Sequence, residues 1–207
     1  MNRYVAAHAQ QEYALRGGAM EVDIDASLPT LQKQGKLHAL RNISKLGKIT
    51  YRALGFSGDN TVKNEVIVRF LKLEVEGQGD GSDISITPAN YKFKYKGMAE
   101  FDGRDIYVLH LSPRQKKIGL FKGEIWLDAA TYMPVRESGQ FVKTPSIFLK
   151  KMQFVREYEI RDGVAVPQKL VSLNDVRFFG KVQMNVNFGK FSKDPDEDVA
   201  ASPSSSQ

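Results

Sequence analysis

Strict alternation of apolar and polar residues constrains the fold of this chain more than any other feature. In KVQMNVNF (181–188) every second residue is apolar and its neighbours are polar. Residues two apart lie on the same face of a β-strand, so the segment is predicted to be a strand with one apolar and one polar face. Strands of this kind form antiparallel sheets that have one face on a core and the other in water.

The same alternation recurs from residue 84 onward. It occurs in NYKFKYKGMAEF (90–101), RDIYVLHLSPR (104–114), IGLFKGEIWLD (118–128), MPVRESGQFV (133–142), LKKMQFVREYEI (149–160) and VAVPQKLVSLNDVRF (164–178). Shorter runs precede it in MEVDIDASL (20–28), KLHALRNI (36–43) and KITYRALGF (48–56). Roughly nine to eleven strands are therefore expected. A single twisted sheet of this many strands has to curl, which leaves an apolar concave face.

Two segments have the character of helices. Residues 2–16 are rich in Ala and Gln and end at a pair of glycines. Residues 60–76 can be capped by Asp59 or Asn60. The apolar residues of this second helix form one stripe, to which Val62, Val66, Ile67, Phe70, Leu71 and Leu73 belong. We predict an α+β protein, mainly β, in which both helices cover the concave face of an unclosed β-barrel.

Charge divides the 207-residue chain into two parts. The segment 1–193 is expected to be one domain, followed by a disordered tail, 194–207, that holds four acidic residues and no basic ones. The net charge is +6, and because the tail contributes −4, the rest of the chain carries +10. A body this basic is attracted to polyanions, including the anionic surface of a membrane.

Signatures of catalysis are weak. The chain has no cysteine, which excludes disulfides, thiolate metal sites and cysteine nucleophiles. Asp23 and Asp25 share a strand face, but a polar sheet face explains them at least as well as paired catalytic carboxylates. GQGDG (77–81) follows a helix and precedes a strand, the reverse of the order in a phosphate-binding loop. No metal-ligand spacing connects the three histidines, His8, His38 and His110. We expect no enzyme, no metal and no cofactor.

A nucleic-acid interface is also disfavoured. The segment YKFKYK (91–96) interleaves aromatic residues with lysines, but strand geometry sends the two sets to opposite faces. Base stacking requires aromatic and cationic side chains on the same side. The three aromatic residues are therefore expected to form a buried row, with the lysines in water: Tyr91, Phe93 and Tyr95.

Two helices of this length cannot easily fill the concave face of so wide a sheet. Either long side chains fill it, or a cavity remains. Curved sheets with apolar interiors commonly bind lipid-like ligands. The candidate cavity residues are the aromatic row, the second helix, and the apolar face of the strand 149–160, on which Met152 and Phe154 lie.

The order of these elements resembles the LolA-like family of periplasmic lipoprotein carriers, which are unclosed β-barrels with helical lids. GKLHALRNISKLGKITYRALG (35–55) is similar to the second and third strands of that family, with Gly35 opening a strand and Arg41 six positions later. DIYVLHLSPR (105–114) with IGLFKGEIWLDAATYMPVRES (118–138) resembles the central hairpins, and EYEIRDGVAVPQKL (157–170) a later one. The resemblance covers most of residues 1–193.

This resemblance implies a function and a set of site residues. It implies a non-enzymatic periplasmic binder of lipid or lipoprotein acyl chains, monomeric, with its signal peptide removed and with membrane-bound loading or accepting proteins as partners. Arg41 would act as a lid latch by bonding carbonyls of the helical lid, although Asn42 stands where the family has proline. The ligand would contact Val62, Val66, Ile67, Phe70, Tyr91, Phe93, Tyr95, Met152 and Phe154.

Two alternatives remain open at this point. The same scaffold with a filled core would be a protein-interaction or sensor module without a lipid ligand. Arg41 would then be an ordinary solvated arginine. The volume and lining of the concave face distinguish the two.

The hairpin IWLDAATYMPVR (125–136) is expected to mark a place where the sheet curls. Asp128 to Thr131 fits a type I turn with Asp at its first position. Pro134 gives up a ladder hydrogen bond, which a sheet tolerates at an edge or a bulge. By parity Trp126 lies on the more polar face, away from a pocket.

Overall fold

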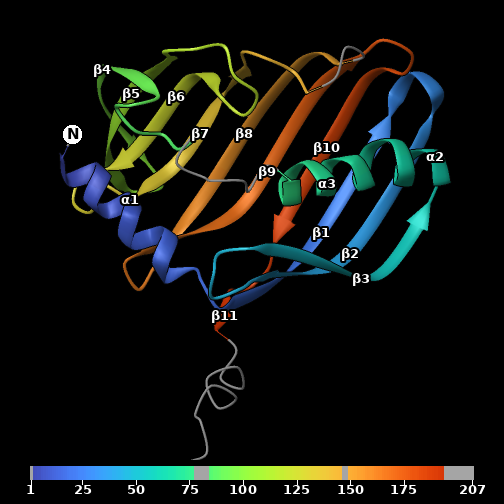
Figure 1. The fold of residues 1–207 in the computed structure, drawn as a ribbon, viewed down its shortest axis with the longest axis horizontal. Coiled ribbons are helices and arrows are strands. Elements are labelled where there is room, and N and C mark those ends of the chain that lie inside the picture. Colours follow the sequence, from blue (N-terminus) through green and yellow to red (C-terminus); the bar gives the residue numbers. More distant parts are fainter. Residues whose placement is uncertain (1, 77–83, 146–148, 194–207) are drawn as a thin grey trace, which may run out of the picture.

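A single curved antiparallel sheet, with helices on its concave side, forms the body of the protein (Figure 1). The computed structural model describes residues 2–76, 84–145 and 149–193. The loop motif at 77–81 and the acidic tail at 194–207 lie outside these residues. The expected fold class is confirmed, since the sheet is not closed into a barrel.

The elements follow the order that the sequence predicts. The helical elements are α1 (Asn2–Ala14), the short 3-10 helix η1 (Pro29–Leu31), α2 (Asn60–Val62), η2 (Lys63–Ile67) and α3 (Val68–Glu76). The strands are β1 (Gly18–Leu28), β2 (Lys33–Ile43), β3 (Ile49–Gly58), β4 (Tyr91–Phe101), β5 (Arg104–Pro113), β6 (Phe121–Asp128), β7 (Pro134–Phe141), β8 (Leu149–Arg161), β9 (Val164–Val176), β10 (Gly180–Phe188) and β11 (Ser192–Lys193).

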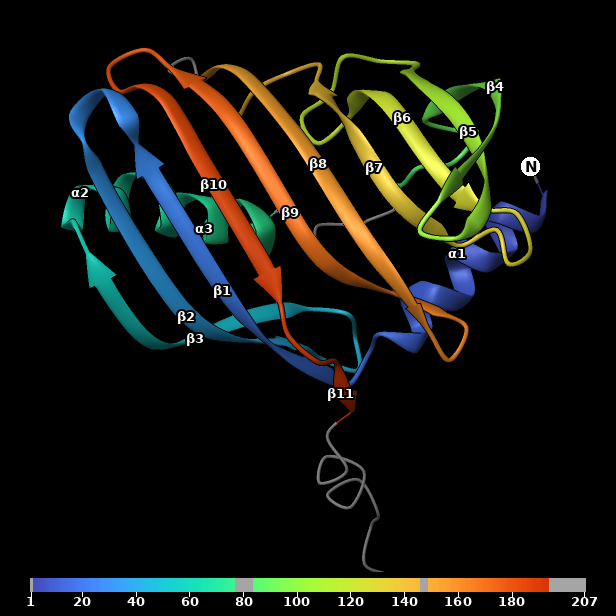
Figure 2. The same ribbon diagram turned by 180° about the vertical axis from the view of Figure 1, so that it is seen from behind.

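The sheet has the order β3-β2-β1-β10-β9-β8-β7-β6-β5-β4, with β11 paired to the start of β1. Long antiparallel pairings join neighbours throughout, and the pairing of β1 with β10 places the first strand beside the last long strand. Figure 2 shows the convex side with the strands in front and the helices behind them. The edge strands of the described sheet are β3 and β4, and β8 lies in its middle.

The second helix begins where a cap was expected. The Asp59 carboxylate accepts hydrogen bonds from the backbone N–H groups of Thr61, at 2.7 Å, and Val62, at 3.4 Å. The helix continues through η2, a π-helical segment, into α3. A π turn has an i→i+5 bond, which rotates the following residues around the axis. Leu73 is consequently 37% exposed, so the expected apolar stripe was wrong at that position.

Burial identifies which strand parity faces the helices. On β1, Val22 and Ile24 are fully buried, and on β10 Val186, directly opposite Ile24, is buried too. Val62 and Ile67 of the second helix pack into the same core. The odd-numbered aromatic residues of β4 and the even-numbered residues of β8 face this side, as their pairing partners show.

The hairpin between β6 and β7 bends the sheet as expected. The register shifts between Trp126 and Leu127, opposite Pro134, which marks a bulge. Asp128 closes the turn by accepting a hydrogen bond from the Thr131 N–H at 2.7 Å. The Trp126 indole donates to Glu124 at 3.2 Å and stacks under the Arg136 guanidinium at 4.8 Å. Trp126 therefore lies outside the concave core.

An aromatic cluster fills the end of the concave face that α1 covers. Tyr4 of α1 lies 6.1 Å from Phe93, and Phe121 lies 5.8 Å from Tyr91 and 4.9 Å from Phe154, measured between ring centroids. The Tyr91 hydroxyl accepts a hydrogen bond from the Phe121 N–H at 3.2 Å. Because Tyr91 is buried, desolvation raises the pKa of its phenol to about 12.

Strands β6 and β7 approach each other closely at a pair of glycines. Gly123 lies opposite Gly139 in the register. A Cβ added at Gly123 would come within 1.9 Å of the Ser138 carbonyl oxygen, closer than non-bonded atoms approach. Only glycine fits there without moving the backbone of β7.

We therefore expect Gly123→Ala to destabilise the protein by about 1–3 kcal/mol, the cost typical of overpacking. Chemical denaturation monitored by circular dichroism measures this change. Gly55→Ala is the matched control, because a Cβ at that strand position meets nothing within 4 Å. Equal stability of the two variants would contradict the close approach.

Tyr91 gives a pH dependence at high pH. Its folded pKa exceeds the unfolded value, so its contribution to stability is complete below pH 10 and is lost as the pH rises toward about 12. Denaturation midpoints measured between pH 9 and pH 12 should fall less steeply for Tyr91→Phe than for the parent. Parallel curves would show that Tyr91 ionises as easily in the folded protein as in the unfolded chain.

Candidate functional site

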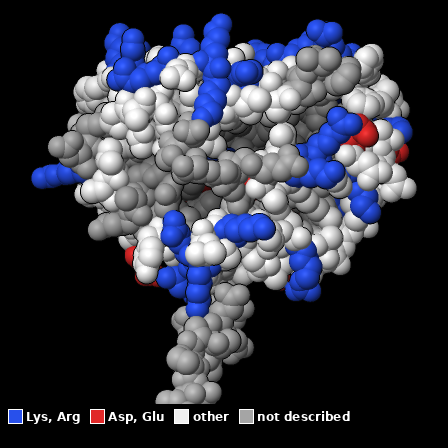
Figure 3. Space-filling view, viewed as in Figure 1, with Lys and Arg blue, Asp and Glu red and all other residues white. Residues whose placement is uncertain are grey.

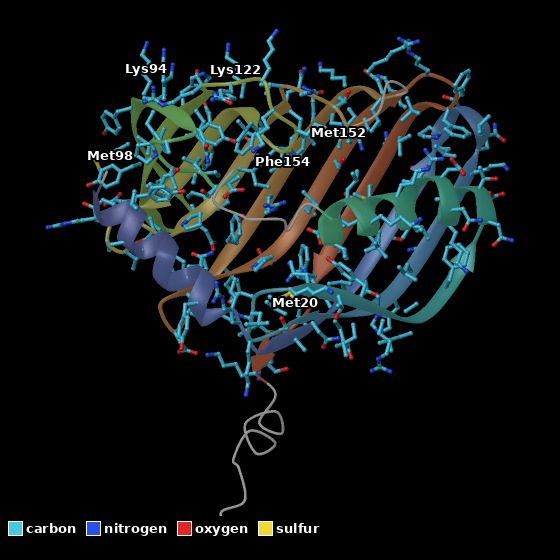
Figure 4. All side chains as sticks on the ribbon, in the orientation of Figure 1. Met20, Lys94, Met98, Lys122, Met152 and Phe154 are labelled. Carbon is cyan, nitrogen blue, oxygen red and sulfur yellow. The ribbon has the colours of Figure 1, made fainter. Side chains whose placement is uncertain are left out.

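The candidate site is the concave face between α1 and the second helix. Figure 3 shows this face hollowed between the two helices. α1 extends from β4, where Tyr4 contacts Phe93, to β9, where Gln11 donates to the Ala165 carbonyl at 3.0 Å. The second helix packs on β1, β2 and β3. The part of β8 that carries Met152 and Phe154 lies between the two helices (Figure 4), whereas Tyr158 and Ile160 at its end pack with Ala7 of α1.

The structure brings most of the expected cavity residues to this face. Val62, Ile67, Tyr91 and Phe154 are buried, whereas Val66, Phe70, Phe93 and Met152 are half-buried. Figure 4 shows Met152 and Phe154 together on β8.

The expected burial of the aromatic row was wrong at Tyr95. Its side chain is 57% exposed, and it contacts Tyr107 edge-on at 6.3 Å. The register of β4 shifts between Tyr95 and Gly97, and β4 is an edge strand, so the end of this row has less cover. The buried part of the row is Tyr91 with Phe93.

Apolar side chains that remain partly exposed line the hollow. They are half-buried and pack against the buried core, and include Phe70, Leu71, Phe93, Leu109 and Phe141. Partial exposure of large apolar groups on a concave surface is the condition for binding an apolar ligand. In the part of the chain that the structure describes, the concave face therefore presents apolar side chains that are only partly buried.

A group of polar side chains lies under the end of α3. Arg41 of β2 is 8% exposed, and its Nε donates to the Tyr51 hydroxyl at 3.1 Å. The Tyr51 hydroxyl donates to the Glu74 carboxylate of α3, which lies 3.8 Å from Arg41 Nε. Burial and the charge of Glu74 raise the pKa of Tyr51. Within the described residues Arg41 contacts this side-chain network, and no helix carbonyl.

A second polar group lies in the middle of the sheet. Arg156 of β8 faces Glu137 of β7, and the distance from Nη1 to Oε2 is 3.5 Å. The same Nη1 lies 3.5 Å from the Tyr158 hydroxyl. Burial, then the charge of Glu137, raises the pKa of Tyr158. Interaction with Tyr158, and then with Glu137 and Glu74, raises the pKa of Arg156 despite its desolvation. This arginine is cationic at any physiological pH.

Sequence reasoning did not select Arg156, Glu137 or Glu74 as site residues. A signal for Arg156 was present, because it shares strand parity with Met152, Phe154 and Tyr158. Its neighbour Glu137 could not be found in this way, since cross-strand register is invisible in the sequence.

The convex face carries lysines and one groove. Lys94 and Lys122 point away from the concave face at the upper rim (Figure 4), and Lys92, Lys94 and Lys96 are all exposed. The expected separation of aromatic and basic side chains on β4 is thus confirmed. A groove of about 420 Å³ is lined by residues of β6 to β9, including Val155, Val171 and Leu173 from the convex side, and also Phe154.

The carboxylates considered for catalysis form ordinary cross-strand pairs on the polar face. Asp23 lies 2.8 Å from His38 Nδ1, and Asp25 lies 2.7 Å from Lys36 Nζ. These groups are well exposed. In the part of the chain that the structure describes, no group of three or more His, Cys, Asp or Glu residues could hold a metal ion.

Comparison with solved structures places this architecture among known folds. A DUF1329 family protein from Desulfovibrio piger superposes with a TM-score of 0.51 at 13% identity, over 94% of this chain and 92% of that one. A LolA superfamily protein from Nitrosomonas europaea gives 0.46 at 10% identity, over 95% of each chain. A domain assigned to outer membrane lipoprotein sorting, from Vibrio parahaemolyticus, gives 0.41 at 12% identity, over 90% and 91%.

No protein-family model matches the sequence, and the comparison with curated proteins gives no match. At identities of 13% or lower, the likeness to solved structures concerns the fold alone. The architecture implied by the sequence resemblance, an unclosed sheet with helices over its concave face, is the one observed, and the DUF1329 family protein shares this fold.

Proposed function

We propose that the protein is a non-enzymatic, periplasmic carrier or binder of the acyl chains of lipids or lipoproteins. The observation that carries the proposal is the hollow on the concave face, lined by large apolar side chains that the helices leave partly exposed. An acyl chain placed there would cover Phe70, Leu109 and Met152 while leaving the buried core intact. Each buried CH₂ would contribute about 0.8 kcal/mol.

The second helix would act as the lid of this site. It packs on the sheet through few fully buried side chains, chiefly Val62 and Ile67. Both lie in its first half, whereas the second half carries Phe70, Leu71 and Glu74, which are only half-buried. An opening motion that begins at the end of α3 would therefore break fewer contacts than one that begins at Asp59. Arg41 would hold this end closed through Tyr51 and Glu74.

Delivery of acyl chains requires contact with membranes or membrane-bound partners. In the described residues, no helix has the length and apolarity needed to cross a bilayer. The exposed lysines of β4 and Lys122 would favour approach to an anionic membrane surface or to an acidic surface of a loading or accepting protein.

Binding of a ligand on the concave face can be tested by introducing a charge at one of two matched positions. Met152→Glu places a carboxylate in the hollow and should lower the affinity for the neutral probe N-phenyl-1-naphthylamine by about tenfold or more, because the charge would have to be desolvated. Leu173→Glu is the control on the neighbouring strand, where the side chain points to the convex face. Fluorescence titration gives both dissociation constants, and thermal melts verify folding.

A second measurement uses the protein from cells. Native mass spectrometry of freshly purified protein should show adducts with the mass of lipids, and organic extraction should release these lipids.

In the fluorescence titration, loss of probe binding in Leu173→Glu but not in Met152→Glu would locate the apolar ligand in the convex groove instead. No adduct and no probe binding in the parent would reject the carrier function.

The latch is tested by Arg41→Met. Removing the guanidinium removes the hydrogen bond to Tyr51 and the ion pair with Glu74 that join β2 to α3, so we expect amide hydrogen exchange in residues 68–76 to rise about tenfold. Arg69→Met is the control on the same helix, because Arg69 pairs with Glu65 at 2.5 Å on the exposed side. Unchanged exchange in Arg41→Met would show that Arg41 does not hold the lid.

The convex groove favours a second candidate function, a protein-interaction or sensor module. Val171 and Leu173 are exposed there, beside Lys122 and two glutamines. In that case Leu173→Glu would abolish capture of a protein partner, and the concave variant would leave it unchanged.

A further inference from the structure

Arg156 is an unusual residue to find on the floor of an apolar hollow. It lies on the central strand β8, and its side chain is 35% exposed, whereas that of its partner Glu137 is 9% exposed. The guanidinium carbon lies 5.9 Å from the centre of the Phe154 ring, next to Met152 on the same strand face. A cation is thus presented to the hollow from within its apolar surface.

The Arg156 guanidinium makes few hydrogen bonds to neighbouring side chains. Its two polar contacts, to Glu137 and Tyr158, both involve Nη1 and both are 3.5 Å long, at the limit of a hydrogen bond. Nε and Nη2 have no hydrogen-bond partner among the described residues. An arginine offers five donors in a planar fork, so two edges of this fork remain available to a ligand.

We propose that Arg156 binds the anionic head group, a carboxylate or phosphate, of an amphiphile whose acyl chain lies in the hollow. The inference rests on the proposed carrier function and specifies its ligand as an anionic amphiphile. Carboxylate and phosphate oxygens match the guanidinium fork and form charge-assisted bonds to it, whereas an alcohol or ester head group offers neither charge nor this geometry.

Charge balance explains how the site accepts an anion. Among the described residues, the two ion pairs on this face join the cations Arg41 and Arg156 to the carboxylates Glu74 and Glu137, so their four charges balance. Glu74 belongs to α3 and interacts electrostatically with Arg156 as well as with Arg41. When the end of α3 lifts, Glu74 leaves with it and one positive charge remains uncompensated. The head group of the ligand replaces the charge of Glu74.

The experiment compares two ligands with the same chain. Displacement of bound N-phenyl-1-naphthylamine is measured at pH 8 with dodecanoate and with the neutral analogue dodecanol, below their aggregation limits, and with acetate and inorganic phosphate, which lack the chain. We expect the parent to bind dodecanoate at least about tenfold more tightly than dodecanol, the factor corresponding to one good charge-assisted contact. Acetate and phosphate should not displace the probe.

The decisive variant is the pair Arg156→Met with Glu137→Gln, which removes the cation without leaving a buried carboxylate unpaired. It should bind dodecanol as the parent does and lose the preference for dodecanoate. Arg156→Lys keeps the charge and should retain part of the preference. Dodecanol binding in each variant verifies that the hollow is intact, so loss of folding cannot mimic the expected result.

The variant Glu74→Gln tests whether the head group of the ligand replaces the charge of Glu74. It should strengthen dodecanoate binding several-fold more than dodecanol binding, because a weaker latch favours both ligands whereas loss of the carboxylate charge favours only the anion. Glu65→Gln on the exposed side of the same helix should change neither. Equal affinity of the parent for both ligands, or a preference that survives loss of Arg156, would overturn the head-group assignment while leaving the carrier function standing. Failure of both chain compounds to bind would reject the carrier function itself.

Discussion

An open sheet that curls has an inner face that its own strands cannot cover, and this constraint organises the rest of the molecule. Closing the barrel would remove the problem, but the edge strands β3 and β4 do not meet. The chain instead covers the two ends of the concave face with helices. α1 completes an aromatic core through Tyr4, and the second helix completes an aliphatic core through Val62 and Ile67. Within the described residues the strip between them is less covered, and Arg156 lies there, whereas Arg41 lies under the end of α3.

The parts of the fold that could be predicted are those that depend on residues close together in the sequence. Period-two alternation, the glycines after α1 and the Asp59 cap are local, and they located the strands and both helices. The π segment at Lys63–Ile67 depends on how the helix fits the sheet, so the exposure of Leu73 was missed. The strand order, in which β1 pairs with β10, depends on long-range contacts that no window of sequence contains. Tyr95 likewise kept its predicted face, but its exposure depends on an edge position.

Prediction of the site from the sequence was limited in the same way, and to a greater degree. Parity placed Met152 and Phe154 on one face of β8, and the same parity applies to Arg156. The electrostatic environment of Arg156 depends on Glu137, which belongs to the neighbouring strand, and on Glu74, which belongs to a helix far away in sequence. The resemblance to carriers singled out Arg41, but not the side chains through which it contacts α3. Register between strands, not the pattern within one strand, assembles these groups.

Charged groups in a partly buried strip have a physical cost that an apolar lining would avoid. Removing an ion pair from water is expensive, and well-packed apolar replacements are often as stable or more so. Arg41 and Glu137 are nonetheless buried, while Arg156 and Glu74 remain partly open to the hollow. In the proposed carrier, opening of the lid would move Glu74 away from Arg156, and the anionic head group of a ligand would replace its charge. Burial of the chain would then supply affinity, and Arg156 would select the head group.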